Sequence, residues 1–230
     1  MSGRERKPPR RPPVPMPALR REGSVAVPAG PRAQQTRAKL MEAARAVFAE
    51  QGYSSTSVAD IIERAGVSFG TYYQYFNNRG DVLVAMLTVT LQEMFASADP
   101  KWRADEGRAG LYRVIHNFVD AYATAGTAAR IWEEASIVEP EMAGVRRSVG
   151  QTMTAAVEGE LLRASKAGRC RPFDAQEAAL AATALAAMVD RFCFVTYVFD
   201  PPERPVTVDD AARALTDLWA DAIGLVEPDA

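Results

Sequence analysis

Hydroxyl groups, aromatic rings and glycines come together in a short stretch from residue 66 to residue 76, GVSFGTYYQYF. If the stretch is helical, Tyr72 and Phe76 share one face, and Gly70, Thr71, Gln74 and Tyr75 point away from that face. Ser68 can cap such a helix, whose N-terminal backbone N–H groups suit a phosphate. Gly70 has no side chain, so the helix can approach a groove floor closely. The residue types therefore favour binding of a polyanion.

The single histidine, His116, offers little metal or acid–base chemistry. Only Asp120 lies one helical turn away as a possible carboxylate partner, and no cysteine is near. We expect His116 to be a partly buried polar group, on the wall of a pocket or elsewhere, rather than a metal ligand. The sequence predicts no metal site.

The chain also carries two closely spaced acidic pairs, Glu133–Glu134 and Glu139/Glu141. Adjacent residues on a helix point apart, and no nucleophile or oxyanion feature accompanies either pair. Phosphate-binding glycine loops, G-x-S-x-G and H-E-x-x-H are absent from the sequence. We therefore expect solvated acidic faces, no catalytic residues, no cofactor and no enzyme activity.

The charge is divided unevenly along the 230 residues. The formal net charge is −2, but residues 1–80 carry 13 Lys/Arg and 6 Asp/Glu, whereas residues 81–230 carry 14 and 23. A basic N-terminal part before an acidic remainder indicates a polyanion partner for the first part only.

Residues 1–31 contain eight of the fifteen prolines and a run of arginines. Such a segment buries too little apolar surface to offset the cost of ordering, so we predict a disordered, basic, Pro-rich arm. Two interpretations stay open: a solvated leader, or an arm that touches DNA phosphate or the minor groove.

Residues 32–80 predict three helices, two of them short. The first ends at Gly52, the second runs from Ser57 to Gly66 with a capping-box-like start, and the third carries the opening stretch to Phe76. Asp81 is the expected N-cap of a long fourth helix. Short helices separated by a glycine turn are typical of a helix-turn-helix, which binds DNA through its second helix.

Residues 56–83, TSVADIIERAGVSFGTYYQYFNNRGDVL, resemble the DNA-binding domain of the tetracycline-repressor (TetR) family. The resemblance covers about residues 36–87. It implies an all-α fold, with this N-terminal domain followed by a larger helical domain, residues 81–230, for effector binding and dimerisation. It also implies DNA-binding roles for eight positions: Ser57, Ser68, Phe69, Gly70, Thr71, Tyr73, Tyr75 and Arg79. Phe69 cannot hydrogen-bond a base edge, so it either meets a thymine methyl or covers the domain's core.

Beyond the fourth helix the sequence predicts helices over 106–124, 127–138, 140–166, 174–199 and 207–224, separated by glycine and proline. In the family a cavity among the fourth to eighth helices takes a small effector. Aromatic and methionine side chains in this region favour an apolar effector. The candidate lining residues are Phe95, Tyr112, His116, Trp132, Met153, Met188 and Phe192.

The last two predicted helices carry apolar stripes with small residues that permit close approach between helices. Intramolecular packing is one explanation; the family resemblance and the need to read two half-sites favour a homodimer through a four-helix bundle. The candidate interface residues are Ala181, Ala184, Leu185, Ala211, Leu215, Leu218, Trp219 and Ala222.

Together these features predict a cytoplasmic, ligand-responsive regulator, most simply a repressor, that binds a palindromic double-stranded operator. No membrane partner is expected, because Asp190 and Arg191 interrupt the most apolar run. The two cysteines, Cys170 and Cys193, are expected to be reduced thiols, with one disulfide as the alternative. An all-helical protein-interaction module or a helical enzyme is the alternative function.

Overall fold

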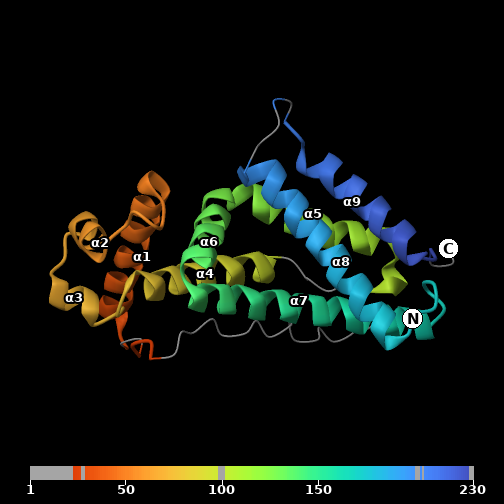
Figure 1. Cartoon of the computed structure of the whole chain (residues 1–230), viewed down its shortest axis with the longest axis horizontal. Coiled ribbons are helices and arrows are strands. Elements are labelled where there is room, and N and C mark those ends of the chain that lie inside the picture. Colours follow the sequence, from red (N-terminus) through yellow and green to blue (C-terminus); the bar gives the residue numbers. More distant parts are fainter. Residues whose placement is uncertain (1–22, 27–28, 98–101, 200–202, 204, 228–230) are drawn as a thin grey trace, which may run out of the picture.

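The computed structural model describes residues 23–26, 29–97, 102–199, 203 and 205–227, and these residues form helices without a β-strand (Figure 1). The all-α prediction is confirmed. The expected disordered arm falls mostly on residues 1–22, which lie outside the described residues.

The first three helices form a small N-terminal domain. They are α1 (Pro31–Gln51), α2 (Val58–Ala65) and α3 (Phe69–Tyr73). Their core contains Phe48, Ile61 and Tyr72, each with no exposed surface. The predicted three-helix pattern is therefore present.

The third helix is shorter than predicted. The sequence placed it through Phe76, but α3 ends at Tyr73. The N–H groups of Gln74 and Tyr75 bond to carbonyls three residues earlier, at Thr71 and Tyr72. This tighter winding ends α3 in a turn, and it changes the direction of Tyr75 relative to an ideal helix.

The start of α2 is held by the predicted capping box. Ser57 Oγ accepts the Asp60 N–H at 3.2 Å, and the Asp60 carboxylate accepts the Ser57 N–H at 2.7 Å. Two N–H groups that the helix cannot satisfy internally are thus paired. At the other end Gly66 takes a left-handed conformation, with φ of 58°, which suits glycine.

The fourth helix, α4 (Arg79–Ser97), begins two residues before Asp81, so the prediction of Asp81 as its N-cap is wrong. The Asp81 N–H instead donates to the side chain of Asn78 at 3.0 Å, and the Asp81 carboxylate accepts the Asn77 N–H at 3.0 Å. An Asn one turn earlier provides the same chemistry as the expected aspartate.

The remaining helices agree with the predicted ranges to within one residue, except that η1 was not predicted and that α8 ends five residues before the predicted end. They are η1 (Ala104–Glu106), α5 (Gly107–Thr124), α6 (Gly126–Val138), α7 (Pro140–Lys166), α8 (Ala175–Phe194), the π-helical turn η2 (Val195–Phe199) and α9 (Val208–Ile223). The predicted helix 174–199 is therefore divided at Val195. In Figure 1, α4 leads from α1–α3 into these helices, and α6 and α7 meet at a sharp corner.

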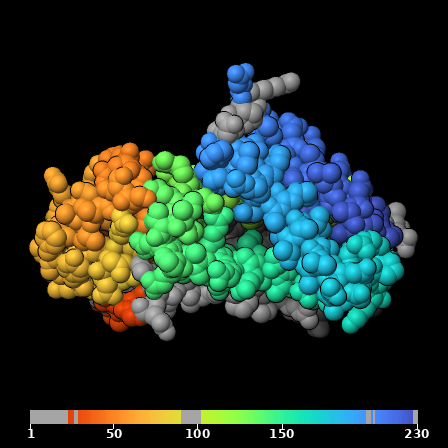
Figure 2. All heavy atoms as spheres, in the orientation of Figure 1, coloured from red at the N-terminus to blue at the C-terminus, as the bar shows by residue number. Residues whose placement is uncertain are grey.

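Two hydrophobic cores hold the chain together. The first contains α1–α4 and also side chains of α6 and α7, among them Ile131 and Met142. The second joins α5, α7, α8 and α9, and Trp219 Nε1 donates to the Leu185 carbonyl at 3.2 Å within it. On the face shown in Figure 2, α6 and α7 lie between α1–α3 and α8–α9. The helices α1–α4 therefore share one core with α6 and α7, and the boundary predicted at residue 80 stays a prediction.

The segment Ala175–Phe199 is long and apolar enough to cross a membrane by length and composition, which is weak evidence for a span. In the structure, one face of α8 packs into the second core, but only a third of the segment's most apolar window is buried. We interpret α8 as a core helix that leaves a second apolar face exposed.

Both cysteines are buried free thiols, as expected. Burial raises the pKa of both, that of Cys193 to about 12. At neutral pH each is therefore a protonated core residue.

We predict that Ser57→Ala lowers the free energy of unfolding by about 1 kcal/mol, because Ala cannot accept the Asp60 N–H. Urea denaturation followed by circular dichroism measures it. Ser55→Ala, at an exposed residue just before the cap, is the control and should change stability by less than about 0.5 kcal/mol. Equal effects of the two substitutions would contradict a role for the cap.

Candidate nucleic-acid interface

The outward face of α3 carries large side chains in solvent. Phe69 is 57% exposed and Tyr73 is 50% exposed, whereas Tyr72 between them is fully buried. Exposed aromatic rings on so short a helix are unusual for a monomer surface and point to a contact. The sequence left open whether Phe69 covers the core of the domain. Its exposure shows that Phe69 does not.

The other predicted residues of α3 lie on the same outer surface. Gly70 is exposed and Thr71 is half-buried. Ser68 Oγ accepts the Thr71 N–H at 3.1 Å and lies 2.9 Å from Thr71 Oγ1, so the two hydroxyls form one capping unit. The helix presents its glycine and its hydroxyls toward solvent beside the rings.

Tyr75 and Ser57 lie outside α3, just after its end and at the start of α2. Tyr75 is half-buried and lines a shallow pocket of about 500 Å³ with residues of the start of α1, including Arg32 and Thr36. Ser57 is exposed, with its hydroxyl donating to Asp60 at 2.8 Å. Contact of either side chain with DNA stays a prediction.

Arg79 has a structural role that the sequence did not indicate. One terminal nitrogen, Nη1, lies 2.8–3.0 Å from the carbonyls of Tyr53, Ser54 and Thr56, and the guanidinium lies 4.5 Å from the centre of the Tyr53 ring. Its Nε lies 3.5 Å from Glu139. Arg79 thus holds the loop between α1 and α2, and a direct phosphate contact stays a prediction.

The acidic residues Glu134, on α6, and Glu139, which follows α6, are not simply solvated, and this corrects the expectation from sequence. The Glu134 carboxylate accepts the N–H groups of Tyr53 and Ser54, both at 2.9 Å. The Tyr53 hydroxyl donates to Glu139 at 2.6 Å. Partial burial would raise the pKa of Glu134, but the hydrogen bonds from Ser54 and Tyr53 outweigh it and lower the pKa. We call this set of contacts, with Arg79, the α6 clamp.

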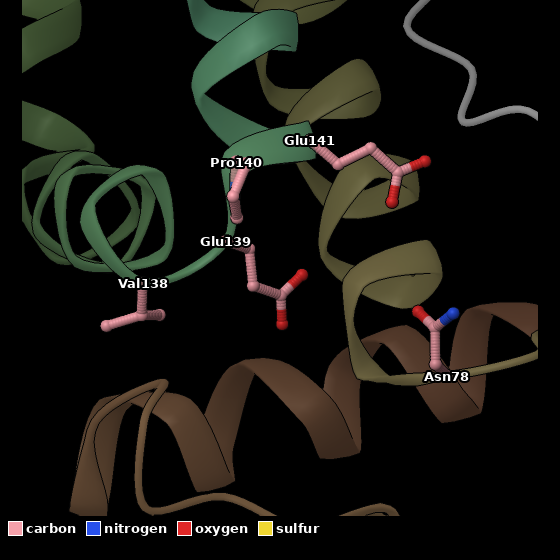
Figure 3. A pocket seen from close by; sticks show the side chains of 5 residues that line it. All are labelled: Asn78, Val138, Glu139, Pro140 and Glu141. Carbon is pink, nitrogen blue, oxygen red and sulfur yellow. The ribbon is translucent and has the colours of Figure 1, made fainter.

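The clamp borders a pocket of about 380 Å³ at the corner between α6 and α7. Figure 3 shows the Glu139 side chain on one side of this pocket and Asn78, at the start of α4, on the other. The corner is therefore the place where the N-terminal domain, α4 and α6 meet.

A second polar network begins one residue before the clamp. Glu133 pairs with Arg146 of α7, and Arg146 also lies 3.7 Å from Asp190 of α8. The Tyr122 hydroxyl of α5 donates to Asp190 at 3.1 Å, and burial, together with the Asp190 charge, raises the pKa of Tyr122. Neighbouring residues of α6 thus connect to the N-terminal domain and to the C-terminal helices.

The predicted effector residues do not gather around one described cavity. Trp132 and Met153 pack against the first core, and Tyr112, Met188 and Phe192 pack against the second. The two described pockets are lined by other residues. The side chain of Phe95 lies outside the described residues, and the set as a whole stays a prediction.

His116 is placed differently from its expected pairing. Its Nε2 lies 3.2 Å from Asp209 at the start of α9, and the Tyr112 hydroxyl donates to the same carboxylate oxygen at 2.9 Å. Asp120 was the partner suggested by sequence spacing. Tertiary packing of α5 against α9 provides a nearer one.

The predicted interface residues divide into two groups. Ala211, Leu215, Trp219 and Leu185 are buried inside the protomer, which is the intramolecular packing that the sequence left open. Leu218 is 57% exposed, and Ala184 and Ala222 are exposed. Ala181 is half-buried. A contact between two copies would use the exposed group.

We predict that Glu134→Gln destabilises the fold by about 1–2 kcal/mol at pH 7, because a neutral amide is a weaker acceptor and one of its ends cannot accept an N–H. The lowered pKa means that the carboxylate stabilises the fold above the pKa of an unfolded glutamate, roughly 4.3, and that this stability is lost as pH falls through the folded pKa. The difference from wild type should therefore shrink toward low pH in urea titrations. A difference independent of pH would contradict the assignment.

The N-terminal domain matches a family model. Residues 40–86 match the model described as bacterial regulatory proteins, tetR family. The regulator TtgR of Pseudomonas putida is 46% identical over 55 residues, which are 24% of this chain and 26% of TtgR. The chain thus spans about a quarter of the length of TtgR and of the similar ArpR.

Longer matches extend the similarity beyond this domain. A solved regulator from Syntrophomonas wolfei has a TM-score of 0.67 at 16% identity, covering 82% of this chain and 95% of that one. The SmeT–triclosan complex has a TM-score of 0.65 at 21% identity, covering 86% and 97%. The regulator BetI of Stenotrophomonas maltophilia is 31% identical over 164 residues, which are 67% of this chain and 77% of BetI. The extent of that match, together with the helix-turn-helix and its exposed α3 face, shows that the chain belongs to the tetR family of bacterial regulatory proteins.

Proposed function

We propose that this protein is a cytoplasmic transcriptional regulator, most simply a repressor, that binds a palindromic operator and leaves it when a small effector binds. The observation that carries the proposal is the exposed face of α3, with its cap, its glycine and its two protruding rings. Second helices of a helix-turn-helix read the major groove with such a face.

Different residues of α3 offer different kinds of contact to DNA. Tyr73 offers a hydroxyl to a phosphate oxygen, and Thr71 offers one to a phosphate or a base edge. Phe69 offers an apolar edge to a thymine methyl, and Gly70 lets the backbone approach the bases. Arg79 supports this face indirectly, because it holds the α1–α2 loop against which the domain packs.

The supporting argument for an effector is the arrangement of α6. Its Glu134 side is bound to the N-terminal domain, and its Glu133 side is bound to α7 and α8 through Arg146. A ligand that separated α7 from α8 would pull on α6 and move the α1–α2 loop. SmeT is described in complex with triclosan, which fits a small, largely apolar effector for this chain as well.

Two copies are needed to read two half-sites, and the exposed faces of α8 and α9 provide a self-complementary surface. Leu180 of α8 is 65% exposed, with Ala184 one turn later. On α9 the stripe contains Ala214, Leu218 and Ala222. Small residues beside two exposed leucines suit close packing of four helices.

We predict that Tyr73→Phe weakens operator binding by roughly 5- to 30-fold, because it removes a hydroxyl but keeps the ring. Anisotropy titrations with a palindromic duplex selected from genomic fragments measure this. Phe199→Ala, which removes an exposed ring from η2, is the control and should bind like wild type. Binding without sequence preference at every salt concentration would overturn the proposed function.

A substitution at Arg79 can distinguish a structural role of this residue from a direct contact with phosphate. Arg79→Lys keeps the charge but loses the planar guanidinium, whose Nη1 reaches three carbonyls and which lies over the Tyr53 ring. If its role is structural, the variant loses stability while the salt dependence of the remaining DNA binding is unchanged. A reduced salt slope without loss of stability would show that Arg79 contacts phosphate directly.

We predict that Leu218→Glu converts the dimer into monomers at micromolar concentration, because it places a carboxylate in an apolar seam that already has Asp217 and Asp221 beside it. Light scattering after gel filtration measures the mass. Ile137→Glu, at a residue of α6 that is 77% exposed, is the control and should remain dimeric. A dimeric Leu218→Glu protein would place the interface elsewhere.

A further inference from the structure

The start of α1 packs against the turn that follows the recognition helix, as Figure 1 shows. Thr36 and Tyr75 both line the shallow pocket of about 500 Å³ at this place. The residues that directly follow them, Arg37 and Phe76, are in contact as well, because the Arg37 guanidinium carbon lies 5.4 Å from the centre of the Phe76 ring. We call the pocket, lined by residues 29–33, Thr36 and Tyr75, the α1 pocket.

Arg37, beside the α1 pocket, is a half-buried cation with little compensation from the part of the chain that the structure describes. A guanidinium has five N–H donors, and the bond described here, from Nη1 to the Met41 sulfur at 3.4 Å, uses a weak acceptor. Burial lowers the pKa of Arg37, and no carboxylate among the described residues raises it again. A partly desolvated cation gains free energy when an anion reaches it.

The charge around the α1 pocket has a single sign. Arg32 is exposed and lines the pocket, and none of the lining residues that the structure describes is acidic. Residues 29–41 include Arg32, Arg37 and Lys39 but no Asp or Glu. Tyr75 adds a hydroxyl to this surface. Arginines and a hydroxyl without a carboxylate are the groups with which proteins hold a phosphate.

We infer that the α1 pocket binds one phosphate of the operator backbone in each half-site, with Arg32 and Arg37 as its cations. The inference rests on the proposed operator binding and adds a contact from α1 to those of the helix-turn-helix. Because the pocket is shallow and Tyr75 follows the exposed Tyr73 by two residues, we assign it to DNA rather than to a free phosphate ion. Backbone contacts set the register of a protein on the duplex, so this contact helps to orient α3 in the groove.

The experiment uses operator duplexes in which one backbone phosphate at a time, at the same place in both half-sites, is replaced by an uncharged methylphosphonate. Anisotropy titrations compare the wild type with Arg32→Gln, Arg37→Gln and the double variant. Arg45→Gln is the control, because Arg45 is an exposed arginine of the same helix that lies 3.6 Å from Glu42. Circular dichroism checks the fold of each variant, and the exposed Arg32 tests the pocket even if Arg37→Gln does not fold.

For the wild type, replacement at one phosphate position should weaken binding by roughly 10- to 100-fold, as expected for the loss of charge-assisted hydrogen bonds. Each single variant should respond less to that replacement, and the double variant should not respond, because its contact is already lost. The double variant should also lower the slope of log affinity against log salt by about 1.8, from one phosphate in each of two half-sites. Arg45→Gln should keep the wild-type slope and the wild-type phosphate profile.

The inference is wrong if every methylphosphonate weakens the wild type and the double variant alike, even if the variant binds less tightly, because the arginines would then only support the domain. An unchanged salt slope would have the same meaning. Heat denaturation without DNA identifies a free-anion site: stabilisation by inorganic phosphate that the double variant loses, with an unchanged methylphosphonate profile, would also overturn the inference. Failure of the proposed function looks different, since the wild type would then not distinguish the unmodified operator from a scrambled duplex.

Discussion

One carboxylate, that of Glu134, holds the loop between α1 and α2 through two backbone N–H groups at 2.9 Å. The other contacts of this region depend on where that loop lies. Arg79 donates to the loop's carbonyls, and the Tyr53 hydroxyl donates from the loop to Glu139. An ionised acceptor between two amides is strong and directional, so it fixes the N-terminal domain against α6 more closely than apolar packing alone.

The helices and the outer face of α3 could be predicted from the sequence because they depend on local rules. Ser57 and Asp60 form the capping box three residues apart, and Tyr72 is buried where the helical period places it. Asp81 shows the limit of such rules. Both Asn78 and Asp81 are suitable N-cap residues, and in the structure Asn78 accepts the Asp81 N–H at the start of α4. The early end of α3 could not be predicted either, because no residue between 73 and 76 is a helix breaker that would mark it.

Contacts between distant segments could not be predicted, because sequence spacing contains no information about them. Glu134 lies 81 residues from Tyr53, and His116 pairs with Asp209, 93 residues away. Likewise, periodicity predicted one apolar stripe on α9 that contains both Leu215 and Leu218. Leu215 is buried and Leu218 is exposed, and only the packing of α9 against its neighbours determines this difference. The acidic residues of α6 were assigned to solvent for the same reason.

Gly52 is limited in two independent ways. Its φ of 81° is a conformation that L side chains rarely adopt, and an added Cβ would lie 3.2 Å from a Glu134 oxygen. The backbone conformation and the space beside Glu134 therefore both favour glycine at this position, which lies outside the recognition helix α3. Any side chain at this position would therefore displace the Glu134 carboxylate and weaken the connection between the α1–α2 loop and α6.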